Sequence, residues 1–143
     1  MNKGKVFFTG IALVFALALI MGIQGVALAQ DAKLIKLHSV GEEALTGIFI
    51  DPADAYVKKD TIVVWLSGVV DNEVKIEFAD GKKCKSVIAH NEDFELDQER
   101  WCYVTSFVPF ASTSSLQFTD HGVYEYTVYT KSGIKAKGKI IVE

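Results

Sequence analysis

The chain of 143 residues is 50% apolar and 23% charged, has two cysteines and carries a formal net charge of −3. With only two prolines, plentiful aromatic residues and no long charge run, it does not resemble collagen, a coiled coil or a disordered protein. Because Lys3 and Lys5 lie in residues 1–29, residues 30–143 carry a net charge of −5. This charge disfavours a nucleic-acid partner, since phosphate binding needs a basic surface, and the length suits one domain.

The N-terminal segment has the three parts of a secretory signal. Two lysines within residues 1–5 precede an apolar run over residues 6–21, and Ala27 and Ala29 form an A-x-A cleavage pattern. We therefore expect a signal peptide over residues 1–29, as a short apolar helix, and a periplasmic or secreted domain over residues 30–143. The alternative is an uncleaved membrane anchor, because residues 6–29 are uncharged and about 20 apolar residues span a bilayer.

Both cysteines, Cys84 and Cys102, lie in the part expected to be exported. An even number of cysteines in an oxidising compartment predicts one disulfide, and closing this loop would contribute roughly 3 kcal/mol. A zinc site is the alternative. It fits less well, because the spacing lacks closely paired cysteines and the three histidines of the chain are scattered.

Strand patterns begin directly after the signal segment. We expect short strands over residues 34–37 and 45–50, followed by a turn over residues 51–54. Residues 62–66 are all apolar, which predicts a central strand covered on both faces. After a loop over residues 67–72, residues 74–78 alternate between apolar and charged, as in a strand with one wet face. Asp80 and Gly81 then predict a turn.

The second half of the exported chain continues this pattern. Residues 84–89, 101–108 and 112–118 are expected strands, and the acidic residues 91–99 a loop or a single helical turn. Residues 123–130 and 134–142 predict a hairpin around residues 131–133. Seven to nine short strands without a sustained helical period predict an all-β fold, a Greek-key β-sandwich, in one domain.

Two stretches carry a family resemblance. The first has Pro52, Val57, Thr61, Val63 and Trp65, with Asp60 in place of a glycine, and the second is the F-T-x-x-G-x-Y-x-Y segment of residues 118–126. In this order they resemble the cupredoxin family, the plastocyanin and azurin type of β-sandwich, and the resemblance implies a cupredoxin-like fold. Immunoglobulin-like domains use a similar turn to place a buried tyrosine, so an adhesion or structural module of that class is an alternative.

The resemblance also implies where a blue-copper site would lie. The family uses two histidines, a cysteine and usually a methionine. The first histidine position is Asn72 by strand parity or Glu73 by counting from the tryptophan, and the cysteine position is Val128. The second histidine and the methionine would fall within residues 131–137, which begin with Lys131 and contain neither residue type. A blue-copper centre depends on a copper–thiolate bond in a His₂Cys arrangement. We therefore expect a copper-free domain with no cofactor.

Two charged sets are candidates for a partner surface. The acidic set is Glu92, Asp93, Glu95, Asp97 and Glu99, and the basic set is Lys135, Lys137 and Lys139. The acidic set could dock a basic partner such as a c-type cytochrome or bind a hard cation, or it could be a solvated loop. Alternation places the lysines on the wet face of a strand, where they would form a positive edge that opposes edge-to-edge pairing or binds a partner.

No serine or cysteine in the sequence has a convincing base partner. Aromatic residues at alternating strand positions are expected to fill the core, with a sugar-stacking platform as the alternative; they are Trp65, Trp101, Tyr103, Tyr124 and Tyr126. We therefore expect a non-enzymatic exported module that binds another cell-envelope protein. The alternative is a periplasmic metal-binding or electron-transfer protein with unusual ligands.

Overall fold

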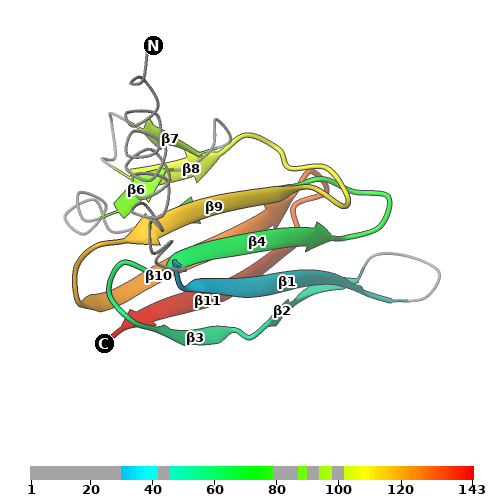
Figure 1. Cartoon of the computed structure of the whole chain (residues 1–143). Coiled ribbons are helices and arrows are strands. Elements are labelled where there is room, and N and C mark those ends of the chain that lie inside the picture. The colour runs from blue at the N-terminus through cyan, green and yellow to red at the C-terminus, as the bar shows by residue number, and fades with distance from the viewer. Residues whose placement is uncertain (1–29, 42–45, 79–86, 90–93, 98–101) are drawn as a thin grey trace, which may run out of the picture.

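The computed structural model describes residues 30–41, 46–78, 87–89, 94–97 and 102–143. In these ranges every regular element is a strand, and the strands form two sheets packed face to face (Figure 1). The first sheet has the order β2 (Gly47–Asp51), β1 (Ala32–Val40), β4 (Ile62–Gly68), β9 (Thr113–Phe118) and β6 (Val87–Ala89). The second has the order β3 (Asp54–Val57), β11 (Lys135–Val142), β10 (Gly122–Thr130), β5 (Val74–Phe78), β8 (Cys102–Thr105) and β7 (Phe94–Asp97). The prediction of an all-β sandwich is confirmed.

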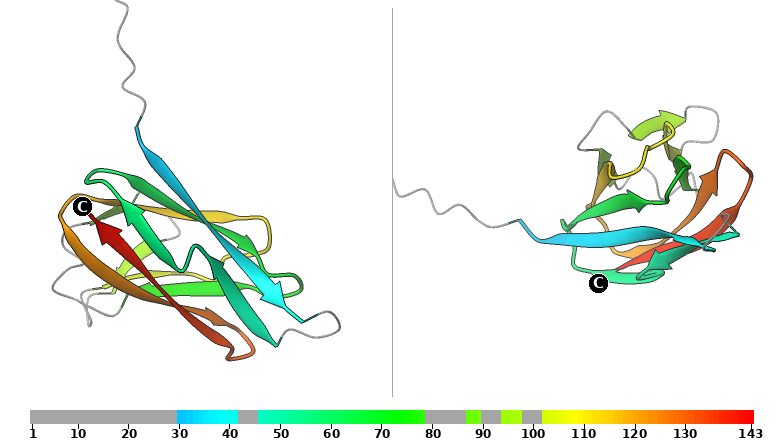
Figure 2. Two further views of the ribbon diagram at one scale, coloured as in Figure 1. Left: turned by 90° about the horizontal axis from the view of Figure 1, so that it is seen from below. Right: turned by 90° about the vertical axis from the view of Figure 1, so that its right-hand side faces the viewer.

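Both sheets are mixed. Strands β1 and β4 run parallel, as do β3 and β11, and the other pairs are antiparallel. The chain passes from the first sheet to the second between β2 and β3, at the cis peptide bond Asp51–Pro52. Strand β3 then lies beside β11, the last strand of the chain (Figure 2). Among the described residues, no helix is long and apolar enough to cross a membrane.

Aromatic side chains fill the space between the sheets. Trp65 from the first sheet contacts Phe78 and Tyr126 from the second, with ring centroids 5.8 and 5.5 Å apart and edge-to-face geometry. Phe94 and Phe118 complete the cluster. The predicted core positions of Trp65 and Tyr126 are confirmed, since each is 1% exposed. Edge-to-face pairs of this kind add about 1 kcal/mol each beyond the area they bury.

Tyr124 is the buried tyrosine that the turn within residues 118–126 predicts. It is buried against Phe118, and its hydroxyl donates a hydrogen bond of 2.9 Å to the backbone carbonyl of Asp120. His121 in the same turn is exposed. The turn therefore fixes the start of β10 relative to the end of β9.

Two strands were not predicted. Residues 54–57 form β3 beyond the expected turn, and Phe94–Asp97 forms β7 where an acidic loop or helical turn was expected. The count in the described ranges is therefore eleven, above the predicted seven to nine. Backbone pairing explains both differences, because β3 is held by β11, from the other end of the chain, and β7 is held by β8, the next strand along the chain.

The prediction that residues 62–66 are covered on both faces is wrong. Val63 and Trp65 are buried between the sheets, whereas Ile62, Val64 and Leu66 point outward and are only partly buried. The run of apolar residues shows that both faces of β4 are apolar. It does not show which faces are covered, and the second sheet covers only one of them.

The prediction of a positive edge at β11 is also wrong. Lys135, Lys137 and Lys139 lie on the outward face of the second sheet, but β11 is an interior strand between β3 and β10. The reason is the crossing after β2, which places β3 outside β11, where it pairs with Lys139–Val142. The expected signal peptide lies outside the described residues.

Candidate partner-binding surface

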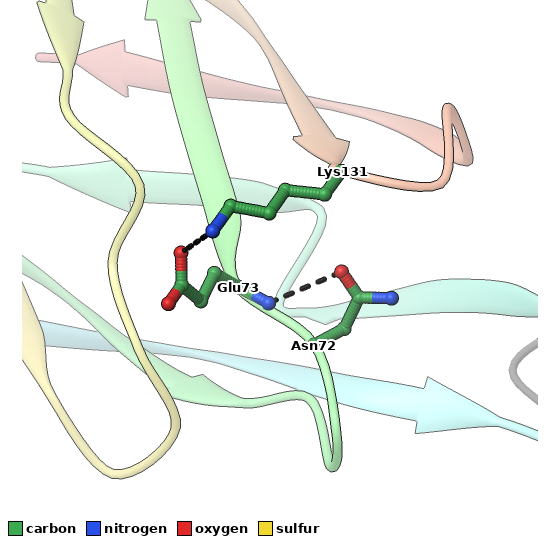
Figure 3. A network of polar contacts seen from close by, with 3 residues as sticks. All are labelled: Asn72, Glu73 and Lys131. Carbon is green, nitrogen blue, oxygen red and sulfur yellow. Dashed lines mark hydrogen bonds and ion pairs between the residues drawn. The ribbon is translucent and has the colours of Figure 1, made fainter.

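Three loops meet at one end of the sandwich: residues 69–73 between β4 and β5, residues 106–112 between β8 and β9, and residues 131–134 between β10 and β11. Glu73 and Lys131 form an ion pair across this end, with 2.5 Å between Oε2 and Nζ (Figure 3). The backbone N–H of Glu73 donates to Oδ1 of Asn72 at 3.1 Å, and the amide of Asn72 reaches Oγ of Ser132 at 3.5 Å.

The ion pair is exposed to solvent. The side chain of Lys131 is 58% exposed and that of Glu73 is 38% exposed. Exposed pairs of this kind contribute at most about 1 kcal/mol. The charges of Glu73 and Lys131 cancel one another. Asp71 is also exposed, and among the described residues of this end it has no ion-pair partner.

Large apolar side chains surround these polar groups. Val70 is 54% exposed, Phe110 56% and Phe107 39%, and the ammonium of Lys131 lies 5.2 Å from the centre of the Phe107 ring. Val70, Phe110 and Lys131 border an open hollow of about 850 Å³, whose other lining residues are Asp71, Asn72, Glu73 and Ser132. We call these residues and Phe107 the end surface.

Backbone bonds hold the loop that carries the two phenylalanines. Between them, Val108 is 3% exposed and exchanges two hydrogen bonds with Val74, at 3.0 and 2.7 Å. The N–H of Ala111 donates to the carbonyl of Ser67 at 2.7 Å, and Ala111 has a φ of 60°, in the left-handed region. Such a conformation costs a non-glycine residue of order 1 kcal/mol or more. The loop is therefore fixed to both sheets while Phe107 and Phe110 stay at the surface.

The structure brings together three of the four positions at which the resemblance implies copper ligands. Asn72, Glu73 and Lys131 lie at the end surface, whereas Val128 is fully buried in the core opposite Ile76 and Ala136. An amide, a carboxylate, an ammonium and a hydrocarbon do not make the His₂Cys donor set of blue copper. These residues therefore do not fit that centre. In the described ranges no three His, Cys, Asp or Glu side chains gather as metal ligands would.

The two charged sets do not form one surface. Glu95 and Asp97 lie on β7, at one edge of the second sheet, while the lysines lie on β11, with three strands between β11 and β7. Lys139 pairs with Asp54 at 3.2 Å, and Lys135 lies 5.2 Å from the centre of the Tyr129 ring. Of the three lysines, Lys139 therefore has its charge paired within the domain.

Several predicted residues lie outside the described part of the chain. These are Cys84 and the acids Glu92, Asp93 and Glu99. Cys102 begins β8, but the position of its side chain is not described. The disulfide and the cation site of the acidic set therefore stay predictions.

The core contains polar atoms without partners. The hydroxyl of Tyr126 and the indole N–H of Trp65 are buried near one another without reaching hydrogen-bond geometry, and the hydroxyls of Ser67 and Ser114 are also unpaired. Burial raises the pKa of Tyr126 to about 12; the Trp65 indole acts in the opposite direction and the Asp54 carboxylate in the same one. The phenol is therefore neutral at physiological pH and has no acid–base role there.

Comparison with known proteins gives a likeness of fold. No protein-family description matches the sequence, and no curated protein matches it. Among solved structures, the chain is similar to a reduced copper(I) form of an amicyanin variant at pH 4, with 16% identity and a TM-score of 0.47 over 82% of this chain and 87% of that one. An oxidised amicyanin variant matches with 17% identity and a TM-score of 0.48 over the same shares. A reduced variant matches with 16% identity and a TM-score of 0.48 over 78% and 82%.

The apolar part of the end surface was not predicted. Phe107 was expected inside a strand, and Val70 and Phe110 were not singled out. The available signal was Pro109, which lacks the N–H that a strand ladder needs and so ends the apolar run of residues 101–108 before Phe110. An aromatic residue directly after such a break is free to point to the surface.

Proposed function

We propose that this chain is an exported, copper-free, cupredoxin-like module that binds another protein of the cell envelope through the end surface. We propose a binding role for this module and no catalytic one. Export rests on the signal pattern of residues 1–29, and the absence of copper rests on the donor groups at Asn72, Glu73, Val128 and Lys131.

One observation supports the end surface most strongly: exposed Phe107 and Phe110 are carried by a loop that backbone hydrogen bonds fix to both sheets, and the N–H of exposed Val70 donates to Oγ of Ser39 on β1. Protein interfaces are enriched in aromatic residues at their centre and are polar at the rim. A loop fixed in the free protein also loses little conformational entropy on binding. The end surface has this composition and this rigidity.

The chemistry of the surface describes the partner. Its apolar residues suit an apolar side chain, Asn72 and Ser132 offer hydrogen bonds, and Asp71 suits a cationic group at the rim. The partner should therefore present an apolar side chain beside a lysine or arginine.

Affinity capture from the native envelope, with quantitative mass spectrometry, tests this proposal. Phe110→Asp and Val70→Asp should each reduce capture of the same partner about tenfold or more, because they place a charge at the centre of the contact. Tyr56→Asp is the matched control, since Tyr56 is 60% exposed on β3, away from the end surface. Equal loss with all three variants, or capture unaffected by the first two, would contradict the proposal.

The metal part is tested separately on the same purified samples. Elemental analysis and copper titration should give no stoichiometric copper and no intense blue absorption from a copper–thiolate bond. A stoichiometric blue copper centre would favour the electron-transfer alternative and would overturn the copper-free assignment.

A further inference from the structure

The outward face of the first sheet is unusually apolar for a solvent-facing surface. Leu34 and Val40 of β1 are each 45% exposed, and Phe49 of β2 is 59% exposed. Register places Leu34 beside Val64, the middle of the three partly buried outward residues of β4. We call the outward side chains Leu34, Val40, Phe49, Ile62, Val64 and Leu66 the apolar face.

The second sheet shows what a solvated face of this same chain looks like. Its outward positions carry the charged residues Asp54, Lys75, Glu77, Glu125, Lys135, Lys137 and Lys139. Among the described residues of β1, β2, β4 and β9, the outward acids and bases are Lys36, His38 and Asp51. Lys36 and His38 lie between Leu34 and Val40 on β1, so they interrupt the apolar face. The contrast still favours a covered face, since soluble monomers rarely leave many large apolar side chains of one face in solvent.

The geometry points to a second copy of this chain as the occupant of the apolar face. We propose that two copies pack their first sheets face to face about a two-fold axis. Two identical sheets have the same twist, so they can pack in the aligned manner of a β-sandwich.

Charge supports a copy of the same chain. Lys36 and Asp51 are register partners with opposite charges, Asp51 on the edge strand β2 and Lys36 in the middle of β1. In a two-fold arrangement the lysine of one copy can approach the aspartate of the other, twice per dimer. The charges of Lys36 and Asp51 cancel, so two such faces can meet without repulsion between like net charges, although residues 30–143 as a whole carry a net charge of −5.

Area sets the expected strength. Four strands about 4.8 Å apart, with about seven residues each at about 3.3 Å per residue, make a face of roughly 450 Å². Two copies would bury about 900 Å² in total, which is below the roughly 1,200–2,000 Å² of a stable specific interface and in the range of weak, transient ones. The dimer should therefore be weak and should dissociate on dilution.

Sedimentation velocity of the full-length gene product, purified after export, provides the first test. The wild-type protein should show a concentration-dependent shift from monomer to dimer. Leu34→Glu and Phe49→Glu should each weaken dimerisation about tenfold or more, because each charge enters the interface twice. Tyr56→Glu, an equally exposed site on the second sheet, should leave it unchanged. Circular dichroism melting confirms that each variant is folded.

Carbodiimide cross-linking of the wild-type protein gives a second test that needs no variant. In a mixture of ¹⁵N-labelled and unlabelled copies, the covalent dimer should contain a Lys36–Asp51 cross-link that joins one labelled and one unlabelled peptide. A wild-type protein that stays monomeric at high concentration would overturn the proposal. So would cross-links confined to single copies, or a dimer weakened only by Tyr56→Glu. None of these results bears on the end surface, because the two surfaces share no residue.

Discussion

Replacing Tyr126 by phenylalanine tests the description of the core. The Tyr126 hydroxyl is buried without a hydrogen-bond partner, whereas the Tyr124 hydroxyl, two residues earlier on the same strand, donates to Asp120. A buried unpaired hydroxyl costs about 1–3 kcal/mol, and a formed hydrogen bond contributes about 1 kcal/mol. Tyr126→Phe should therefore leave the free energy of unfolding unchanged or raise it by up to about 1 kcal/mol. Tyr124→Phe, the matched control, should lower it by about 1 kcal/mol.

The raised pKa of Tyr126 adds a pH dependence whose sign follows from linkage. The folded phenol titrates near 12 and the unfolded one near its ordinary value of 10.0. Below pH 10 both states keep the proton. Above it the unfolded state loses the proton first, so stability falls as the pH rises and the full loss is reached above pH 12. At pH 11 the loss is about 1.4 kcal/mol, since one pKa unit corresponds to 1.36 kcal/mol.

Urea unfolding followed by tryptophan fluorescence at pH 8 and pH 11 measures both effects. The stability of wild type relative to Tyr126→Phe should fall by about 1.4 kcal/mol between these pH values. A loss of about 1 kcal/mol in Tyr126→Phe at pH 8 would show that the hydroxyl is paired. An equal pH dependence in both proteins would show that burial does not raise the pKa of this phenol. Either result would refute the reasoning.

Three further substitutions probe packing, a buried hydrogen bond and the end surface, each by urea unfolding at neutral pH. Gly138→Ala should destabilise by about 1–3 kcal/mol, because its Cβ would lie 2.5 Å from Cζ of Tyr126; a smaller effect would mean that the ring can move aside. Thr105→Val should cost about 1–3 kcal/mol, since it removes the hydroxyl that accepts the N–H of Ile76 at 2.8 Å, while Thr105→Ser should keep most of the stability. Lys131→Met should change stability by less than about 1 kcal/mol, and a larger loss would mean that the ion pair is structural.

The elements that could be predicted from sequence are those whose burial is decided locally. Strand β5, Val74–Phe78, was predicted with its observed bounds, because each apolar residue faces the core and each charged residue faces solvent. The pairing of β10 with β11 and the Tyr124 corner were also predictable, since the turn residues and the alternation lie within one short stretch. In each case the residues within the element are enough to predict it, and no distant part of the chain is needed.

The elements that could not be predicted depend on distant partners. Strand β3 exists because β11, from the other end of the chain, pairs with it in parallel. The end surface likewise depends on three loops separated by up to about 60 residues, and only the position of Glu73 and Lys131 near one another could be expected from the family resemblance. Neither β3 nor the end surface could be predicted, because the alternation of apolar and polar residues within one segment does not show which distant strands and loops become its neighbours.

The positions of Val128 and its three companions explain how such a sandwich can change its surface chemistry without losing its fold. Val128 contributes to the core between Ile76 and Ala136, so a hydrocarbon there stabilises the domain whatever the loops carry. Asn72, Glu73 and Lys131 lie outside the core, on the loops over residues 69–73 and 131–134. Side chains on those loops can therefore be exchanged at little cost in stability. It follows that the binding properties of this end are set by what the loops present, independently of the packing that maintains the sandwich.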